Sequence, residues 1–362
     1  MRIDLEPRQN ISRSRELMAP VAALVIAILL GGVAVALMGI SPLEAFRIYF
    51  VDPLTNTTDL QEIAVKASPL VLIAVGLAFC YRANLWNIGA EGQFVIGGTV
   101  GGGIAILTHN GAYQSVWGGG WILPTMLLFG ALGGMVYALI PALLKVKLGV
   151  SEILSSLMLV YVAQLILDYL IRGPWRDPKG FNFPQSVPFD AEATLPLLLS
   201  SGRLHFGVII TLIVVVIAAI VFARTMFGYQ VRVVGAAPRA AQFSGFKSGR
   251  LTYAVFAISG ALAGLAGVME VSGQIGQLQP SISPGYGFTA IIVAFLGRLS
   301  PVGILIGGLV LAVTYIGGEF AQVSLKIPQD MTRVFQGLLL MCVLAADVYT
   351  RYKVHFRIGA GQ

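Results

Sequence analysis

The chain has 362 residues, of which 56% are hydrophobic and only 11% charged, against about 25% charged in an ordinary soluble domain. Its mean hydropathy is +0.82, which argues against a soluble enzyme and is typical of a polytopic membrane protein. The formal net charge of +7 does not indicate nucleic-acid binding, because the basic residues stand at the ends of apolar segments rather than on one surface.

Apolar segments recur along the chain and predict an all-α membrane helix bundle with about ten transmembrane segments. Several of the segments, notably the third, eighth and ninth, are shorter than the roughly 20 residues that cross a bilayer. Such short or broken spans often lie beside a transport path. The ten segments are residues 18–40, 63–81, 93–109, 121–144, 152–171, 204–223, 251–271, 286–297, 302–320 and 332–350.

The lysines and arginines set the expected orientation. With the amino terminus inside, 16 of the 24 fall on the cytoplasmic side, so both termini are expected to be cytoplasmic. This gives an amino-terminal tail (1–17), a single transmembrane domain (18–350) and a carboxy-terminal tail (351–362). The chain is thus expected to be a multi-pass membrane protein.

Two segments between spans are long. The outer one, 172–203, holds several prolines and is expected to be an extended loop. The inner one, 224–250, contains Pro238, which suits the first turn of a short helix ending near Phe243, with Gly245 as its stop. An ordinary connecting loop is the alternative interpretation of this inner segment.

A polar dodecapeptide, Arg82-Ala-Asn-Leu-Trp-Asn-Ile-Gly-Ala-Glu-Gly-Gln93, interrupts two apolar stretches. Polar groups at membrane depth face a bundle interior or an aqueous path, and broken backbone is tolerated there only inside protein or beside a cavity. The pathway or gating candidates, here and elsewhere, are Asn84, Trp86, Asn87, Glu91, Gln93, Glu270, Gln274, Glu319 and Gln322.

Simple structural roles compete with these assignments. Interhelical hydrogen bonds are common in such bundles and add about 1 kcal/mol each. For Asn87 and Glu91, one turn apart if helical, a structural or gating role is favoured over substrate contact. Glu270 and Glu319 stand at outer ends of spans, where their carboxylates could reach the interface.

The chain shows no motif for catalysis. It contains no Gly-x-x-x-x-Gly-Lys-Ser/Thr phosphate loop and no His-Glu-x-x-His zinc helix. The three histidines are dispersed, so no metal site is predicted, and no cofactor or catalytic residue is expected. Cys80 and Cys342 are expected to be free thiols.

The segment Asn84-Leu-Trp-Asn-Ile-Gly-Ala-Glu-Gly-Gln93 resembles the hallmark of ABC-importer permeases for nucleosides and simple sugars, within the ribose and branched-chain amino acid permease superfamily. The similarity covers nearly the whole chain after residue 40. Further matching segments are Lys147–Leu154, Gly173–Pro178, Asn182–Ser186, Val234–Ala241, Gly297–Gly303 and Gly317–Gln322.

The resemblance implies an importer of two permeases, ATP-binding subunits and a substrate-binding lipoprotein, located in the bacterial inner membrane. The outer Gly-Pro-Trp-Arg-Asp-Pro loop resembles the longer of two paired permeases, which favours a heterodimer. In that scheme one coupling helix contacts the ATPase. Its residues would be Val234, Gly235, Pro238, Arg239, Ala240, Ala241 and Gln242.

The leading hypothesis is therefore an ABC-importer permease for nucleosides, with purine nucleosides favoured, and with ATP hydrolysed by a partner. A permease for a simple sugar such as ribose is the alternative. An ion-driven secondary transporter, with Glu91 and Glu319 carrying protons or cations, is less favoured. A membrane scaffold without transport leaves the polar residues of the spans unexplained.

Overall fold

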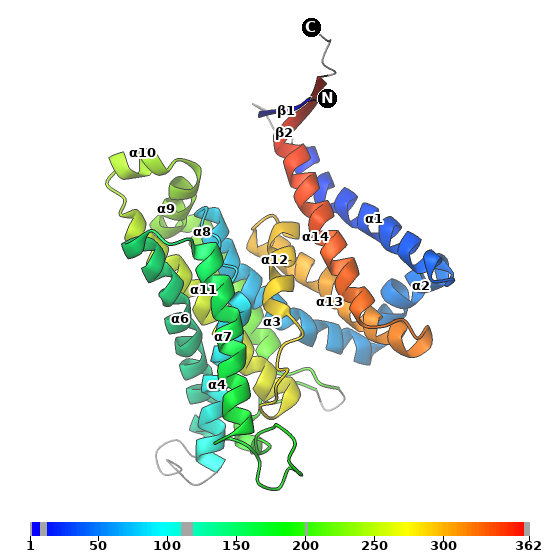
Figure 1. The fold of residues 1–362 in the computed structure, drawn as a ribbon, viewed down its shortest axis with the longest axis vertical. Coiled ribbons are helices and arrows are strands. Elements are labelled where there is room, and N and C mark those ends of the chain that lie inside the picture. Colours follow the sequence, from blue (N-terminus) through cyan, green and yellow to red (C-terminus); the bar gives the residue numbers. More distant parts are fainter. Residues whose placement is uncertain (1, 8–12, 110–118, 200–201, 358–362) are drawn as a thin grey trace. The chain divides into compact units, whose positions relative to one another are not determined.

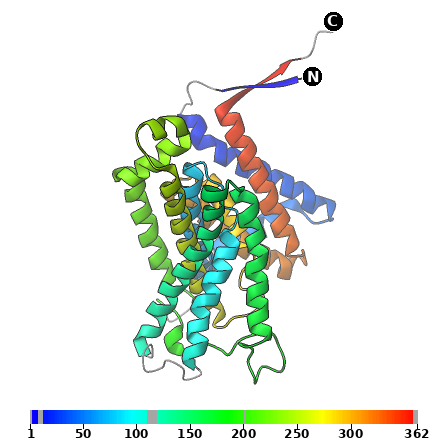
Figure 2. The ribbon, with the colours of Figure 1, turned by 60° about the vertical axis from the view of Figure 1, so that its left-hand side comes forward.

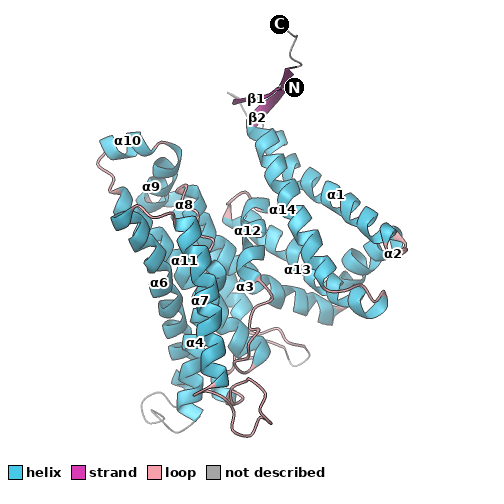
Figure 3. Cartoon of the chain, in the orientation of Figure 1, coloured by secondary structure: helices cyan, strands magenta, loops and turns pink. Residues whose placement is uncertain are grey.

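The computed structural model describes residues 2–7, 13–109, 119–199 and 202–357, and these are predominantly helical (Figures 1 and 3). They form two compact units, one of residues 60–312 and one of residues 1–59 with 313–362. The all-α bundle expected from the sequence is confirmed, with one two-stranded ribbon in addition.

The first unit holds most of the helices. In chain order they are α3 (Thr57–Arg82), α4 (Ala90–His109), the 3-10 turn η3 (Gly119–Trp121), α6 (Ile122–Leu148), α7 (Glu152–Arg172), the 3-10 turn η4 (Ala191–Ala193), α8 (Gly207–Arg224), α9 (Met226–Ala236), α10 (Pro238–Phe243), α11 (Ser248–Glu270), the π-helix η5 (Val271–Ile275), α12 (Tyr286–Leu296) and α13 (Pro301–Ser324). The first residues of α3 and the last residues of α13 belong to the second unit.

Glycines bring α4, α6 and α11 into backbone contact, and Figures 1 and 2 both show these helices side by side. A β-carbon built at Gly97 of α4 would overlap the backbone of Gly264 in α11. One built at Gly134 of α6 would overlap the carbonyl oxygen of Gly260 in α11. Apolar association cannot drive helices together in lipid, so this close packing of small residues stabilises the unit.

Nine helices of the described chain are long and apolar enough to cross a membrane. The expectation that the third and ninth apolar segments are too short was wrong. α4 has 20 residues and α13 has 24, because both helices continue into polar residues that a hydropathy window leaves out. Only the eighth segment remains short, as the 11-residue helix α12.

The backbone between α11 and α12 is irregular. α11 ends in the π-helix η5, Gly276 takes a left-handed conformation (φ 74°), and the chain stays non-helical to Gly285. α12 therefore begins inside the unit, with N–H groups at its first turn that no preceding turn can bond.

The second unit comprises α1 (Arg13–Leu37), α2 (Pro42–Phe46), the π-helix η1 (Arg47–Val51), the 3-10 turn η2 (Asp52–Leu54), the end of α13 and α14 (Asp330–Arg351). The strands β1 (Arg2–Pro7) and β2 (Tyr352–Arg357) pair antiparallel. The residues expected to be terminal tails thus contain a ribbon and the first turns of α1, while residues 1, 8–12 and 358–362 lie outside the described part.

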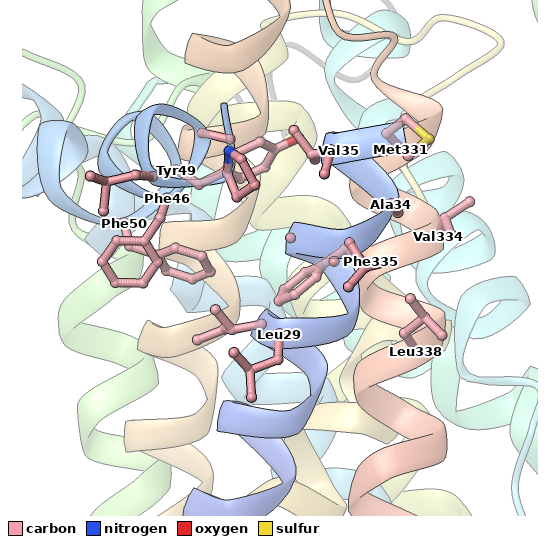
Figure 4. A pocket seen from close by; sticks show the side chains of 18 residues that line it. Leu29, Ala34, Val35, Phe46, Tyr49, Phe50, Met331, Val334, Phe335 and Leu338 are labelled. Atoms are coloured by element: carbon pink, nitrogen blue, oxygen red, sulfur yellow. The ribbon is translucent and has the colours of Figure 1, made fainter. Parts of the chain in front are cut away.

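An apolar cavity of about 500 Å³ lies between α1, α2 with η1, and α14 (Figure 4). Phe46, Phe50 and Phe335 line it, and the Phe50 and Phe335 rings meet edge to face with centroids 6.0 Å apart. Among its lining side chains Tyr49 alone carries a polar group, and that hydroxyl lies 3.2 Å from the Thr332 hydroxyl. A polyhydroxylated solute would find few partners there.

Candidate functional site

The polar dodecapeptide begins at the end of α3. Leu85 N–H donates to the carbonyl of Cys80 (3.0 Å) and Asn84 N–H to that of Tyr81 (3.0 Å). Asn84 has φ 56° and is exposed. This is the left-handed helix ending that asparagine tolerates better than most residues.

Asn87 and Gln93 form a reciprocal amide pair inside the unit. The Asn87 Nδ2 donates to Gln93 Oε1 and the Gln93 Nε2 donates to Asn87 Oδ1, each at 3.0 Å. Asn87 also donates to the Ser259 hydroxyl of α11 (3.0 Å) and accepts from the Gly89 N–H (3.1 Å). Both amides are buried and bonded, which favours a structural role over contact with a substrate.

Glu91 connects α4 to α12. It is 3% exposed, and its Oε2 accepts from the backbone N–H of Gly287 at 2.6 Å. The Ser283 hydroxyl also bonds to this carboxylate, and Ser283 Oγ accepts from the N–H groups of Gly285 and Tyr286. A carboxylate at a helix N-terminus satisfies free N–H groups and interacts favourably with the helix dipole. Glu91 thus caps the half-helix α12.

Asn87 and Glu91 do not share a helix, because α4 begins only at Ala90. The two side chains bond to different partners: Asn87 to α4 and α11, Glu91 to the start of α12.

Trp86 belongs to an aromatic cluster at the same end of the unit. Its ring centroid lies 5.2 Å from that of Tyr81 and 5.9 Å from that of Phe295 in α12. The Tyr81 and Phe295 rings stack at 5.3 Å. Trp86 is 37% exposed, so one part of this cluster is open while the rest links α3 to α12.

Glu270 ends α11 and is 6% exposed, so its carboxylate does not reach the interface as the simpler alternative supposed. The Tyr286 hydroxyl donates to it at 3.4 Å, and the Lys66 ammonium is close enough to act on its charge. Lys66 Nζ also lies 6.0 Å from the centre of the Tyr286 ring. The structure thus gathers an acid, a base and a phenol from three helices.

Lys66, Tyr286, Ser259 and Ser283 were not predicted from the sequence as members of these groups. A lysine within an apolar span indicates a functional site, but Lys66 was used only to assign the orientation of the chain in the membrane. The serines carry no such signal, because serine is common in helix contacts.

The remaining pathway candidates are dispersed. Gln274 is half-buried in η5, four residues after Glu270. Glu319 and Gln322 lie in the last turns of α13, in the second unit, and both are exposed. The pathway role of all these residues stays a prediction.

The long outer loop packs along the irregular segment after α11. Leu195 N–H donates to the Ser272 carbonyl (2.9 Å) and Phe189 N–H to that of Gly276 (2.8 Å). Ser186 N–H donates to the Leu278 carbonyl (2.9 Å), and Leu278 N–H donates to the Ser186 hydroxyl (2.9 Å). The loop is irregular as expected from its prolines, and it holds the break before α12 in place.

The inner segment forms two helices, not one. Ala237 has φ −144° and ψ 75°, which ends α9, and Pro238 then starts α10. The assignment of Val234 and Gly235 to the same helix as Arg239 was therefore wrong, because proline disfavours the helical conformation for the residue before it. The expected helix from Pro238 to Phe243, with Gly245 left-handed (φ 78°), is confirmed.

α10 presents its side chains outward. Arg239, Ala240 and Gln242 are exposed, Phe243 is 94% exposed, and Ala241 alone of this helix is buried. Beside it, a hollow of about 350 Å³ lies between α9, the 245–247 turn and α11. Its wall includes Phe227 and Phe246, and Lys247 and Arg250 contribute positive charge. A helix with an exposed aromatic side chain beside a basic hollow is suited to protein binding.

The family of the chain follows from a comparison of its sequence with known protein families. Residues 60–344 match the family described as branched-chain amino acid transport system / permease component. The chain belongs to this family of permeases. The resemblance stated from the sequence is thereby confirmed, and the ion-driven alternative is not retained.

Individual relatives differ in what they are named for. The glucose ABC transporter permease protein TsgB13 of Haloferax volcanii is 34% identical over 97% of this chain and 93% of its own length. The nucleoside permease NupB of Lactococcus lactis is 26% identical over 92% of each chain. The guanosine permease NupP of Bacillus subtilis is 25% identical over 96% of this chain and 97% of its own.

The permease is thus a multi-pass membrane subunit of an ABC transport system. Relatives of this type are transport components rather than enzymes, and membership implies an ATP-binding subunit and a substrate-binding protein as partners.

Proposed function

We propose that this permease provides the translocation path of an ABC importer for nucleosides, with purine nucleosides favoured. Energy comes from ATP hydrolysed by a separate subunit. The observation that carries the proposal is the match to nucleoside and guanosine permeases over nearly the full length of the chain. The matched parts of the chain include the short helix α12 and the segment around Glu91 that caps it.

A simple sugar is the second candidate. It is favoured by the glucose permease, whose identity of 34% exceeds that of the nucleoside relatives. Nucleosides and sugars share a hydroxylated ring, which requires hydrogen-bonding groups along its path. Tyr286, Glu270 and Lys66 are groups of that kind in the described chain, and we place the solute path beside them.

The ATP-binding subunit docks on α10. Arg239 and Phe243 supply a cation and an aromatic anchor, the residue types that most often dominate protein interfaces, and both are exposed. Lys247 and Arg250 beside the hollow favour an acidic partner surface. The permease resides in the plasma membrane, with α10 and both termini on the cytoplasmic side, where the ATP-binding subunit lies.

The partners complete the importer. A second permease, different from this chain, forms the other half of the path, and a substrate-binding lipoprotein delivers the solute at the outer face. Phe181 (92% exposed) and Phe183 (65% exposed) protrude from the outer loop. Exposed aromatic side chains on that face are suited to contact the binding protein.

The test is uptake by vesicles that contain both permeases, the ATP-binding subunit and the binding protein. Labelled guanosine, adenosine, uridine, ribose and glucose are supplied in turn, with and without ATP. ATP-dependent uptake of nucleosides is expected. Uptake restricted to sugars would establish the second candidate, and uptake without any need for ATP would contradict both.

A further inference from the structure

Gly235 lies at an unusually close contact inside the first unit. It is half-buried, the residue before the last of α9. A β-carbon built at Gly235 would overlap the carbonyl oxygen of Arg82 and lie 2.9 Å from its carbonyl carbon. Glycine alone lets α9 touch the main chain at the end of α3, because any other side chain would separate the two backbones.

The Arg82 side chain is held on α8. Its guanidinium carbon lies 4.1 Å from the centre of the Phe222 ring, a distance at which the cation is attracted to the ring face. Phe222 in turn stacks on Phe79 of α3 with centroids 4.3 Å apart, and Phe79 lies 6.1 Å from Phe227 of α9. The end of α3 therefore fits into the corner between α8 and α9.

The chain beyond Arg82 is bonded at each step to a transmembrane helix. Ile88 N–H donates to the Ser156 hydroxyl of α7 (3.2 Å), and Asn87 donates to Ser259 of α11 (3.0 Å). Glu91 accepts from Gly287 of α12 at 2.6 Å. Buried and fully bonded networks of this kind are rigid. A hydrogen-bonded chain thus connects Arg82 to the start of α12.

We propose that the backbone contact between Gly235 and Arg82 transmits movement of α9 and α10 to residues 82–93 and so to the N-terminus of α12. This inference rests on the proposed function, because it takes α10 as the ATPase contact. In this proposal Gly235 is a positioning residue in the interior of the unit and does not contact the ATP-binding subunit. Coupling between sites requires that α12 take a second position, and this movement is assigned to the start of α12.

Charged and aromatic side chains near the contact between Gly235 and Arg82 also act on Arg82. Arg232 of α9 lies close enough to Arg82 for their charges to repel. Arg82 is kept in place against that repulsion by the ring of Phe222, so a small shift of α9 changes the balance of forces on Arg82. The contact is therefore sensitive to the position of α9.

The experiment compares Gly235→Ala with Gly337→Ala in the reconstituted importer. Gly337 is also a helical glycine, in α14, and a β-carbon there meets nothing within 4 Å. For each variant the amount of ATP-binding subunit that co-purifies is measured first. Solute transported per ATP hydrolysed is then measured in vesicles.

Gly235→Ala is expected to retain the ATP-binding subunit and to lower transport per ATP by about tenfold, within the usual range of coupling between sites. Gly337→Ala is expected to match the wild type in both measurements. An assembled Gly235→Ala complex with wild-type transport per ATP would overturn the inference.

A second variant tests the proposal if the Gly235→Ala permease does not assemble with the ATP-binding subunit. Phe222→Leu keeps an apolar side chain but removes the ring beneath Arg82, and it is expected to lower transport per ATP in an assembled complex. Wild-type transport per ATP in Phe222→Leu would then overturn the inference. Failure of the proposed function is distinct, because the wild-type complex itself would then show no ATP-dependent transport.

Discussion

The backbone N–H of Gly287 donates to the carboxylate of Glu91 across 2.6 Å, joining the first turn of α12 to the first turn of α4. A β-carbon built at Gly287 would lie 2.5 Å from the Cα of Glu91, so the two backbones also touch. A short helix that begins inside a membrane protein has N–H groups that lipid cannot satisfy. Glu91 and Ser283 satisfy them, which explains why a carboxylate is found at this depth.

Replacing Glu91 tests this capping role. Glu91→Ala leaves the Gly287 N–H buried without its acceptor, and is expected to lower the free energy of unfolding by about 1–3 kcal/mol. Glu91→Gln keeps an acceptor oxygen and is expected to lower it less. Thermal unfolding in detergent measures both, with the exposed Glu192→Gln as control. Equal stability of Glu91→Ala and wild type would show that the bond is not needed.

The Asn87–Gln93 pair predicts a ranked series. Asn87→Ala removes four side-chain hydrogen bonds, Gln93→Ala two of these, and Ser259→Ala one. The loss of stability is expected to decrease in that order, with about 1–3 kcal/mol for each buried polar group left without a partner. The double variant Asn87→Ala/Gln93→Ala should lose less than the sum of the single ones. Strict additivity would mean that the two amides act independently.

The helix bundle was predictable from the sequence because hydropathy reports membrane spans directly. The start and stop of α10 also followed from Pro238 and Gly245, whose backbone preferences are local. The lengths of α4 and α13 were not predictable from hydropathy, since both helices continue into polar residues, which are buried at the start of α4 and exposed at the end of α13.

The site was only partly predictable, because its contacts join residues that are distant in the sequence. The dodecapeptide could be recognised from its polar residues between two apolar segments. Its partners Ser259, Ser283 and Gly287 are distant in the chain: Ser259 lies 172 positions from Asn87, and Gly287 lies 196 positions from Glu91. The division of the inner segment into two helices depended on Ala237, whose conformation proline restricts but does not determine.

The turn just before α8 contains a buried histidine that predicts a pH dependence. His205 is 3% exposed, and its Nδ1 accepts from the Gly207 N–H at 3.2 Å. Burial lowers the pKa of His205 from 6.5 to about 4. Because the unfolded chain then binds the proton more readily, stability is full above pH 6.5 and is lost as the pH falls toward 4, by about 3 kcal/mol.

The measurement is the unfolding temperature of the purified permease between pH 7.5 and pH 4. His205→Asn keeps an acceptor near the Gly207 N–H but does not titrate in this range, so its profile should be flatter than that of the wild type between pH 6.5 and 4. Parallel profiles for the two proteins would exclude His205 as the cause.

The glycine contacts of α4, α6 and α11 predict a severe packing defect. Gly134→Val would force a side chain into the backbone of α11, and overpacking of this kind costs about 1–3 kcal/mol or more. Much less folded protein is expected in the membrane, measured by detergent-resistant monodisperse yield. Gly120→Val, where a β-carbon meets nothing within 4 Å, should give the wild-type yield; a matching loss there would point to insertion rather than packing.

The docking surface on α10 predicts a loss of assembly. Arg239→Glu with Phe243→Ser removes a cation and an exposed aromatic ring, and is expected to weaken binding of the ATP-binding subunit at least about tenfold. Binding is measured by co-purification over a range of subunit concentrations. Lys179→Glu, in the outer loop, is the charge-reversal control, and unchanged binding of the α10 variant would exclude this surface.

In the proposed function, the permease moves its solute with energy from a partner ATPase. The most direct measurement is nucleoside uptake by vesicles of the complete importer, with ATP inside or outside and with a proton ionophore present. Uptake is expected to require ATP on the α10 side, to persist with the ionophore, and to be abolished by the Arg239→Glu/Phe243→Ser permease. Uptake that proceeds without ATP and collapses with the ionophore would contradict it.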